Sequence, residues 1–402
     1  MEKINVLVLI TVMDRAGAET MMMNYLRHID RGKIHMDFLI NRPGRADYED
    51  EVEKLDSKIY HMCALYPGKF RRYRREFRRF LEEHNDYDVI HSNLEEKSYY
   101  ALKIAQEMGI KVRIVHAHSA PKGHDLKMIM RLYFRKKMHK YCTHRVACGE
   151  KAAKWLFGDD INIVSMEEYV EKSNSIDSMS YDGMENKTVV IMKNAIDTKK
   201  FRHSDNERKN IRTELGIDEK TLIIGHVGRF VPVKNQSFLI DIFKYVNNIQ
   251  NNSRLLLIGG GNSKEEISYK QEIQNKVKKL GLEDRVIFTG VREDVNNLME
   301  AMDIFVMPSL SEGFPVTLVE AQAAGLRCLV SDNVQNDVNL TGEIQYKALE
   351  DGEEEWGEKV LEMVNIKIDM FEMEKRVKKA GFDISDNVKL LKEFYVLASR
   401  GK

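Results

Sequence analysis

The stretch TLIIGHVGRFVPVKNQSFLI, residues 221–240, shows the pattern that decides the predicted fold. Its apolar run Leu222–Val227 is rich in Ile and Val, ends in a glycine turn and precedes a segment of helical character. Short continuous apolar runs that alternate with helices are typical of parallel strands buried on both faces of a sheet. We therefore expect an α/β fold in which this run is one of the strands.

The same pattern recurs along the whole chain, in two series on either side of residue 200. The expected strands of the first series are Ile4–Ile10, Met36–Ile40, Lys58–Met62, Asp88–His91, Arg113–His118, His144–Cys148 and Val189–Met192. Those of the second series are Leu222–Val227, Arg254–Ile258, Arg285–Phe288, Ile304–Met307, Arg327–Val330 and Ile344–Lys347. Because two such series do not fit one sheet comfortably, we predict two Rossmann-like domains, residues 1–200 and 201–402. The C-terminal helix can pack back on the first domain.

The composition is that of a globular enzyme of 402 residues, of which 43% are apolar and 31% charged. Lys and Arg number 63, as do Asp and Glu, so there is no electrostatic case for nucleic acid as a partner. The four cysteines have no metal-binding or redox spacing, which suits a reducing cytosol. No apolar stretch is long enough for a membrane span, and Asp14–Arg15 interrupts the apolar N-terminus before it resembles a signal peptide. We expect a soluble or peripheral cytoplasmic protein.

One region departs from the alternating pattern. Between residues 158 and 187 the sequence turns polar and mostly acidic, so we interpret it as a loop or a partly ordered insertion. A short helix over Met166–Lys172 is the one regular element expected there. No chemistry is assigned to this region.

Candidate functional residues are sought where strands end, because ligands of open parallel sheets bind at the carboxyl ends of the strands. Gly17 and Glu19 lie between the first strand and a helical segment. Gly17 either makes a tight strand-to-helix turn or lets the backbone approach an anionic ligand. Glu19 can serve as a first-turn partner of the helix dipole.

Two histidines lie at the end of the strand Arg113–His118. We interpret His118 as a hydrogen-bonding or acid–base group that faces the ligand crevice, and His116 as a core residue. A metal-binding pair is the weaker alternative, because no third ligand lies at a familiar spacing. No metal site is predicted.

Cations and glycines follow the strands of the second series. Gly228, Arg229 and Lys234 come after Leu222–Val227, where two cations and a helix N-terminus can converge on a diphosphate. A solvated pair of cations is the alternative. The three glycines at residues 259–261 make another strand-end turn, which is permissive rather than diagnostic.

The most informative stretch is PSLSEGFPVTLVEA, residues 308–321. Glu312 lies in a loop and Glu320 about two turns into the following helix, so both carboxylates can address one polyhydroxylated ligand. The glycine and proline between them expose backbone amides at the start of the helix. Seen alone, the pair would be explained more simply as a capping acid and a surface acid.

In combination, these motifs resemble those of the retaining glycosyltransferases of family 4, in the branch that builds bacterial capsular polysaccharides and exopolysaccharides. The resemblance spans nearly the whole chain and rests on Glu312 with Glu320, on Gly228-Arg229 with Lys234, and on the segments 17–20, 116–119, 194–197 and 288–290. It implies the GT-B fold, in which two Rossmann-like domains face each other across a cleft. Ala16 departs from the paired glycines that are usual in the family, which puts the geometry of the N-terminal loop in doubt.

The resemblance also implies an activity. The chain would be a metal-independent hexosyltransferase that takes a hexose or N-acetylhexosamine from a nucleotide sugar, expected to be a UDP-sugar. The nucleotide sugar is a substrate, and no cofactor is expected. The acceptor would be a saccharide or a polyprenyl-linked saccharide, in the synthesis of a surface polysaccharide.

The family's functional residues map onto this sequence by position. Arg229 and Lys234 would hold the donor diphosphate. Glu320 would bind the ribose hydroxyls, and Glu312 the hydroxyls of the transferred sugar. The remaining contacts with donor and acceptor would come from Gly17, His118, Gly228, Val291, Arg292, Phe314, Pro315, Val316 and Thr317.

Three other functions are considered. A catalytically silent partner subunit of the same fold would usually lose a site residue, whereas this chain keeps both cations and both carboxylates. A nucleotide-sugar epimerase of the same fold stays a weaker alternative. A nicotinamide oxidoreductase is disfavoured, because the sequence lacks a G-x-G-x-x-G turn with a ribose-binding acid at the expected distance.

The segment KFRRYRREFRRF, residues 69–80, carries seven cations between aromatic residues at helical spacing. Either the aromatic residues face the domain core and the arginines form a solvated face, or the segment holds the protein on an anionic membrane surface. A second basic run follows at residues 131–140. We predict peripheral attachment to the inner face of the cell membrane.

Overall fold

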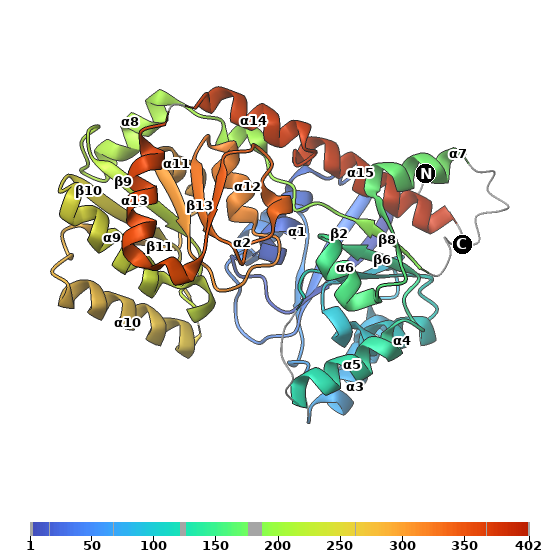
Figure 1. The fold of residues 1–402 in the computed structure, drawn as a ribbon. Helices are drawn as coiled ribbons and strands as arrows, with labels where there is room; N and C mark the ends of the chain where they lie inside the picture. The colour runs from blue at the N-terminus through green and yellow to red at the C-terminus, as the bar shows by residue number, and fades with distance from the viewer. Residues whose placement is uncertain are drawn as a thin grey trace. The chain divides into compact units, whose positions relative to one another are not determined.

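The computed structural model describes residues 3–15, 17–66, 68–120, 126–175, 187–261, 263–366 and 368–400. The chain forms two compact units (Figure 1). The first unit comprises Met1–Ala195 together with Ile384–Lys402, and the second comprises Ile196–Asp383. The first crossing, after Ala195, lies close to the predicted division after residue 200, and the return of the last helix to the first unit agrees with the expectation stated above.

Within its described residues, the first unit contains one sheet of eight parallel strands in the order β3-β2-β1-β4-β5-β6-β8-β7. The strand order reverses between β1 and β4, so the ligand crevice of such a sheet is expected beside the loops that follow these two strands. The strands are β1 Ile4–Ile10, β2 Ile34–Ile40, β3 Ile59–His61, β4 Val89–Ser92, β5 Val112–Ala117, β6 His144–Ala147, β7 Asn162–Ser165 and β8 Thr188–Ile191.

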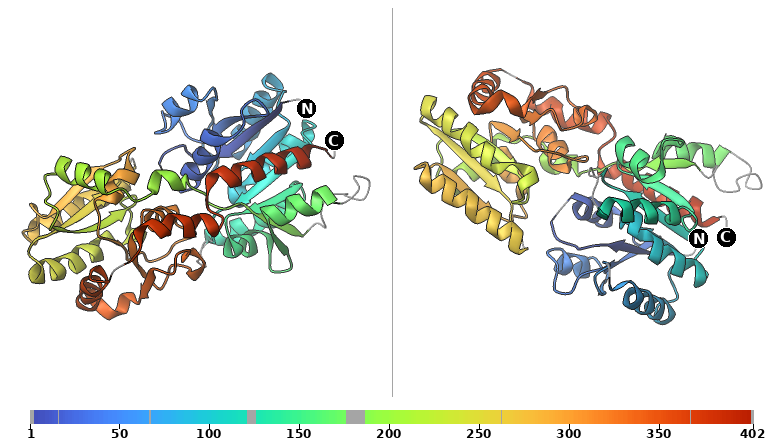
Figure 2. Two further views of the ribbon diagram at one scale, coloured as in Figure 1. Left: turned by 90° about the horizontal axis from the view of Figure 1, so that it is seen from above. Right: turned by 60° about the horizontal axis from the view of Figure 1, so that its bottom comes forward.

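Helices cover both faces of this sheet. They are α1 Gly17–His28, α2 Glu49–Lys54, α3 Phe70–Glu83, α4 Ser98–Glu107, α5 Leu126–Met138, α6 Glu150–Phe157, α7 Met166–Ser175 and α15 Ile384–Arg400. Both views of Figure 2 show α15, in dark red, alongside the first sheet. Its side chains Leu391, Phe394 and Tyr395 belong to the same buried core as the strands, so the last helix completes the first unit.

The prediction for residues 158–187 was wrong in part. The structure places a strand, β7, and a three-turn helix, α7, in this region. The strand was missed because it is a short edge strand in which Val164 is the one buried residue, so it produces no apolar run. Residues 176–186 of the region lie outside the described residues.

The described residues of the second unit contain a sheet of six parallel strands in the order β11-β10-β9-β12-β13-β14. The strand order of this sheet reverses between β9 and β12. All thirteen apolar runs predicted in the two units form strands, whose ends lie within two residues of the predicted ones. The strands are β9 Leu222–Val227, β10 Ser253–Ile258, β11 Val286–Gly290, β12 Ile304–Met307, β13 Arg327–Ser331 and β14 Ile344–Lys347.

Two apolar clusters bury the two faces of this second sheet. Neighbouring residues of one strand join opposite clusters, as Ile223 and Ile224 do, which explains the unbroken apolar runs in the sequence. The helices are α8 Asp205–Glu214, α9 Gln236–Ile249, α10 Lys264–Lys279, α11 Val295–Glu300, α12 Val316–Ala323, α13 Gly352–Val364 and α14 Met370–Lys379.

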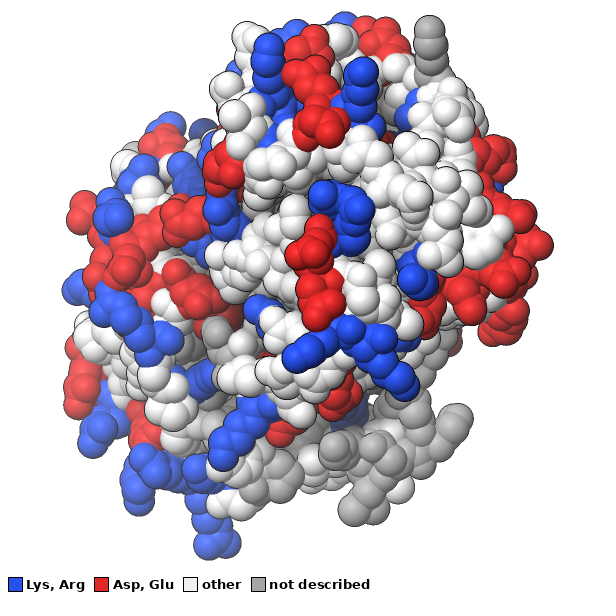
Figure 3. Space-filling model, turned by 90° about the vertical axis from the view of Figure 1, so that its left-hand side faces the viewer, with Lys and Arg blue, Asp and Glu red and all other residues white. Residues whose placement is uncertain are grey.

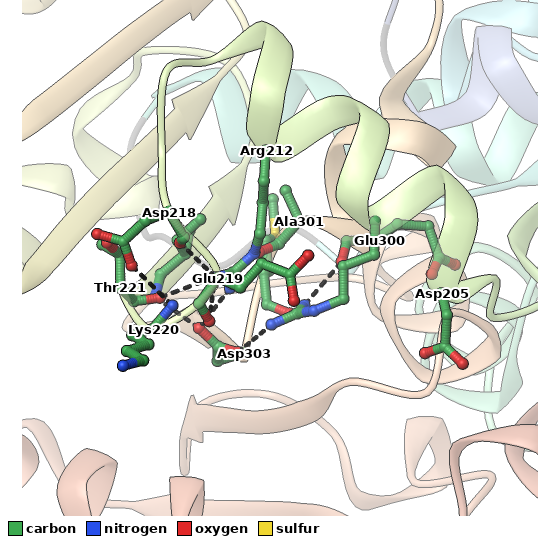
Figure 4. A network of polar contacts seen from close by, with 12 residues as sticks. Asp205, Arg212, Asp218, Glu219, Lys220, Thr221, Glu300, Ala301 and Asp303 are labelled. Carbon is green, nitrogen blue, oxygen red and sulfur yellow. Dashed lines mark hydrogen bonds and ion pairs between the residues drawn. The ribbon is translucent and has the colours of Figure 1, made fainter.

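A buried polar network ties α8 to the amino ends of β9 and β12 (Figure 4). The Arg212 side chain is 1% exposed, and its guanidinium lies 2.9 Å from the carboxylate of Asp303. That carboxylate also accepts the N–H of Ile223 at 2.7 Å. The guanidinium donates further to the carbonyl groups of Asp218, Glu219, Thr221 and Ala301. A buried charge with this many partners is a structural feature rather than a free ligand-binding group.

The surface seen in Figure 3 carries basic and acidic side chains side by side, as the balanced composition leads one to expect. In the part of the chain that the structure describes, no helix combines the length and the apolar character that crossing a bilayer requires.

Candidate active site

One of the two predicted cations and one of the predicted carboxylates meet at the switch point of the second sheet. Lys234 follows β9 and Glu312 follows β12, and Lys234 Nζ lies 2.8 Å from Glu312 Oε1. The two side chains are 18% and 11% exposed. The loops that carry them are also joined through their backbones, because the N–H of Leu310 donates to the carbonyl of Val233 at 2.8 Å. The structure thus brings together two residues that lie 78 positions apart.

The glycines at the ends of β9 and β10 are required by close packing. Gly259 has a φ of +131°, and a Cβ there would lie 2.2 Å from the carbonyl oxygen of Gly228. A Cβ on Gly260 would lie 2.8 Å from Val291 Cγ2, and one on Gly261 would lie 2.2 Å from Glu266 Cβ. The loops after β9, β10 and β11 therefore pack against one another at distances that only glycine permits. The sequence predicted only a turn at these three glycines and did not predict the close contacts that they make.

Arg229 points from the same loop into a different ion pair. Its side chain is 55% exposed, and Nη1 donates to Glu266 Oε1 at 3.0 Å. Its carbonyl accepts a hydrogen bond of 2.8 Å from Nε2 of the fully buried Gln236. Sequence reasoning missed both partners, although Ser263 followed three residues later by Glu266 is a visible capping-box pattern.

The strand β9 places a neutral histidine under this loop. His226 Nδ1 donates to the carbonyl of Val306 at 2.9 Å. Burial lowers the pKa of His226 to about 4, so its imidazole is uncharged near neutral pH. The positive charge of this loop therefore comes from Arg229 and Lys234.

Phe314, Pro315, Val316 and Thr317 lie where the loop after β12 enters α12. The ring of Phe314 stacks on Phe382, with 5.3 Å between centroids and an interplanar angle of 3°, so this side chain is engaged in packing. Pro315 is the N-cap of α12, and Val316 and Thr317 begin the helix. Amide groups of a first helical turn have no acceptor within the helix and attract anions. Glu320 is buried in the second turn of α12.

Val291 and Arg292 lie at the end of β11. Val291 is an exposed apolar side chain. Arg292 makes two hydrogen bonds of 2.7 Å to the carboxylate of Asp294 and one of 3.1 Å to Glu214. These bonds, that to Asp294 above all, raise the pKa of Arg292 further above its ordinary value. The guanidinium of Arg292 thus already donates to two carboxylates of the second unit, those of Asp294 and Glu214.

The two remaining predicted site residues, Gly17 and His118, belong to the first unit. Gly17 is the exposed first residue of α1; its φ is not positive, and a Cβ there would meet nothing within 4 Å. No strained turn and no packing contact among the described residues therefore requires glycine at this position. Ala16, next to it, lies outside the described residues.

His118 follows β5 and is oriented by two side chains that sequence reasoning did not identify. Its Nε2 lies 2.7 Å from Asn93 Oδ1, and its backbone N–H donates to Glu95 Oε1 at 2.9 Å. Burial lowers the pKa of His118 to about 4. Burial likewise raises the pKa of the Glu95 carboxyl to about 7. Glu95 also has a positive φ of 52°, in a residue type that rarely adopts it.

His116 is a buried core residue, as expected. Its Nδ1 lies 3.3 Å from Nε2 of His91, and the other ring nitrogen of His91, Nδ1, lies 2.7 Å from the hydroxyl of Tyr395 on α15. Burial lowers the pKa of His116 well below its ordinary value. Across the described residues, no three side chains of His, Cys, Asp or Glu gather in a way that could hold a metal ion.

Comparisons with known proteins agree on the class of protein. Residues 207–382 match the family described as glycosyl transferases group 1, and residues 15–161 match glycosyltransferase family 4. A glycosyltransferase named EpsF from Bacillus subtilis (strain 168) is 31% identical over 337 residues, which are 83% of this chain and 80% of that protein. A UDP-Gal:alpha-D-GlcNAc-diphosphoundecaprenol alpha-1,3-galactosyltransferase from Escherichia coli is 27% identical over 255 residues, 61% of this chain and 58% of that protein.

Solved structures show the same fold. HepE from Anabaena, crystallised with UDP and glucose, superposes with a TM-score of 0.72 at 17% identity, covering 97% of this chain and 98% of that one. WaaG, a glycosyltransferase involved in lipopolysaccharide biosynthesis, superposes with a TM-score of 0.67 at 14% identity, covering 97% and 99%.

Two doubly wound parallel sheets and the likeness to HepE and WaaG define the GT-B fold. The extent of the likeness to EpsF and the two family matches make the assignment more specific. The chain belongs to glycosyltransferase family 4.

Proposed function

We propose that the protein moves a hexose or N-acetylhexosamine from a UDP-sugar to a saccharide or polyprenyl-linked saccharide, with retention of the anomeric configuration, in surface polysaccharide synthesis. The observation that carries the proposal is the pairing of Lys234 with Glu312 beside Arg229 at the switch point of the second sheet. The Escherichia coli relative, named for UDP-Gal and a diphosphoundecaprenol acceptor, supports the donor and acceptor classes. The crystallisation of HepE with UDP-glucose supports the nucleotide.

The proposed binding mode follows the chemistry of the donor. Arg229 and Lys234 supply positive charge for the diphosphate, and the first-turn amides of α12 supply further donors. Glu312 binds hydroxyls of the transferred sugar, and the buried Glu320 binds the ribose. Val291 offers an apolar surface for the base. Because cations of the chain meet the diphosphate charge, we propose that no metal ion or other cofactor is needed.

In the proposed reaction, the bond between the anomeric carbon and the diphosphate oxygen breaks as an acceptor oxygen bonds to the same face of that carbon. The acceptor proton passes to an oxygen of the leaving diphosphate. Positive charge grows on the sugar ring and negative charge on the leaving group, which Arg229 and Lys234 stabilise. His118, neutral near pH 7, serves as a hydrogen-bonding partner for a substrate hydroxyl and need not remove the proton.

Nucleotide binding tests the proposal most directly. A ligand that binds only the folded chain raises its stability, by about 2.7 kcal/mol at 100 times its Kd, so UDP should raise the melting temperature. GDP and ADP at the same concentrations serve as controls. Stabilisation by GDP or ADP without stabilisation by UDP would contradict the proposed donor. Mass spectrometry of the product made from a panel of UDP-sugars would then identify the transferred sugar.

The basic segment, residues 69–80, forms most of α3, and the burial of its aromatic side chains bears on how it could contact a membrane. Tyr73 and Phe77 are fully buried, so the aromatic side of this helix packs into the first unit and does not insert into lipid. The outer side carries Arg71, Arg74 and Arg75, which line a shallow surface depression together with Arg78. The membrane contact that we propose for α3 is therefore electrostatic.

We propose that this basic face holds the enzyme reversibly on anionic lipid at the inner face of the cell membrane, where a polyprenyl-linked acceptor would be met. Each cation near an anionic leaflet contributes on the order of 1 kcal/mol, and salt screens the attraction. Sedimentation with anionic vesicles should recover the wild-type chain at low salt. Neutral vesicles, and a variant with Arg71, Arg74 and Arg75 changed to Gln, should leave it in the supernatant. Equal recovery under all these conditions would refute attachment.

A further inference from the structure

The two cations of the candidate active site are held to different degrees. Lys234 is 18% exposed and pairs with a carboxylate of similar burial. Arg229 has a side chain that is 55% exposed. A long exposed side chain loses rotamer freedom when it binds a ligand, and that loss weakens binding unless the side chain is already oriented. The residue that orients Arg229 therefore matters for the affinity of this site.

Glu266 is itself held in place. Its Oε2 accepts the backbone N–H of Ser263 at 3.0 Å, and its own N–H donates to Ser263 Oγ at 3.2 Å. These two bonds form the capping box at the start of α10. Gly261 packs against the Cβ of Glu266, and the Glu266 side chain is 12% exposed. The carboxylate is thus fixed from two sides, and Oε1 meets Arg229 Nη1 at 3.0 Å.

The backbone of Arg229 is fixed from the opposite direction. Its carbonyl accepts a hydrogen bond from Gln236, and the N–H groups of its two neighbours, Gly228 and Phe230, donate to the carbonyls of Ile258 and Gly260. With both its backbone and Nη1 held, the guanidinium keeps its other N–H donors on Nε and Nη2 for a ligand. These two donors lie in the plane of the guanidinium and can bind two oxygens of one phosphate group.

We propose that Glu266 is a positioning residue that orients Arg229 toward the diphosphate of the nucleotide donor. This inference rests on the proposed function, because it assumes that Arg229 meets a nucleoside diphosphate. Glu266 does not touch the ligand and acts through the guanidinium. The proposed role of Glu266 depends on the acceptor oxygen Oε1 and not on the negative charge of its carboxylate, because that charge repels the negatively charged diphosphate.

The test is calorimetric titration of the full chain with UDP. Glu266→Ala removes the acceptor and should weaken UDP binding by about fivefold, as expected for freeing one long side chain. Glu266→Gln keeps an acceptor oxygen at the same place and should restore the affinity to within about twofold of wild type. Rescue by Gln is a result that loss of charge alone would not produce.

Two controls separate positioning from helix capping. Ser263→Ala removes one bond of the capping box but leaves the contact between Glu266 and Arg229, so it should lower the melting temperature without changing the affinity for UDP. Glu265→Ala changes an exposed neighbour on the same helix and should change neither. In an Arg229→Ala background, Glu266→Ala should have no further effect on UDP binding.

The inference is overturned if Glu266→Ala leaves the affinity unchanged or increases it, if Gln fails to rescue it, or if the effects of the two alanine substitutions add. It is also overturned if Ser263→Ala weakens UDP binding as much as Glu266→Ala does. The failure of the proposed function would look different: the wild-type chain itself would bind none of UDP, GDP and ADP.

Discussion

The two ends of the central strands β9 and β12 carry the same kind of ion pair in different surroundings. At their amino ends, Arg212 is almost completely buried, and carboxylate and carbonyl oxygens surround its guanidinium. At their carboxyl ends, Arg229 is more than half exposed and pairs with Glu266 through one nitrogen. A buried cation whose donors are used holds the fold, whereas an exposed one with donors left over is able to bind a ligand.

The largest effect should come from the buried end. Arg212→Met removes the cation but leaves the Asp303 carboxylate in place, and breaking a buried pair in this way typically costs about 3–5 kcal/mol of folding free energy. Arg208 still contacts Asp303 and should keep the loss toward the lower figure. Urea unfolding monitored by circular dichroism measures the change. If Arg229→Ala destabilises the chain as much as Arg212→Met, the contrast between the two ends fails.

The next largest effect should come from the exposed end and should appear in activity rather than stability. Lys234→Ala and Arg229→Ala each remove a charge that faces the leaving diphosphate, so each should lower turnover by at least about tenfold. Arg229→Ala, at a side chain that is 55% exposed, should keep a melting temperature close to that of the wild type, whereas Lys234→Ala also leaves the Glu312 carboxylate without its partner and should lower it. Lys264→Ala, at an exposed lysine at the start of α10, is the matched control. Wild-type rates in both site variants would mean that the cations form only a solvated surface.

The two carboxylates at the exposed end should differ from each other. Glu312→Ala should lower turnover more than it weakens UDP binding, because Glu312 is proposed to bind the sugar and also holds Lys234. Glu320→Ala should weaken the binding of UDP itself, because a hydrogen-bonded hydroxyl is typically worth about 0.5–1.5 kcal/mol, or up to roughly tenfold in affinity. Comparing steady-state rates with UDP titrations separates the two roles. The same pattern in both variants would remove the distinction.

The smallest effect is a pH dependence of stability at a second buried pair near the amino ends of these strands. The carboxylate of Glu300, whose Oε2 lies 2.8 Å from His203 Nδ1, raises the pKa of His203 above its ordinary value. The stability it contributes is therefore fully present below pH about 6.5, the value in an unfolded chain, and is lost as the pH rises through the folded pKa. His203→Asn should thus lower the melting temperature more at pH 6 than at pH 9.

His118 supplies a control of opposite sign. Its folded pKa is lowered to about 4, so the unfolded chain takes up a proton first as the pH falls below about 6.5, and stability is lost toward pH 4. His118→Asn should remove part of that loss at acid pH and change little at pH 9. Melting curves of both variants between pH 5 and 9 would test the two signs. A parallel pH response in both variants would contradict the assigned shifts.

Much of the fold could be predicted because its information is local. Most of the predicted strands are apolar runs that a parallel sheet buries on both faces. The same local signals led to Arg229, Lys234 and Glu312, because strand ends and helix starts are where a doubly wound sheet binds its ligand. The edge strand β7 escaped detection because one buried residue gives no periodic signal.

The sequence by itself determined that the chain has two α/β halves and which residue types stand at the ends of their strands. Only the tertiary structure decided that Lys234 meets Glu312 and that Arg229 meets Glu266. These pairings depend on strand order, which places β9 beside both β10 and β12 and so joins loops that are far apart along the chain. An apolar run specifies burial at its own position, whereas a long-range contact exists only after the sheet has brought both partners to the same edge.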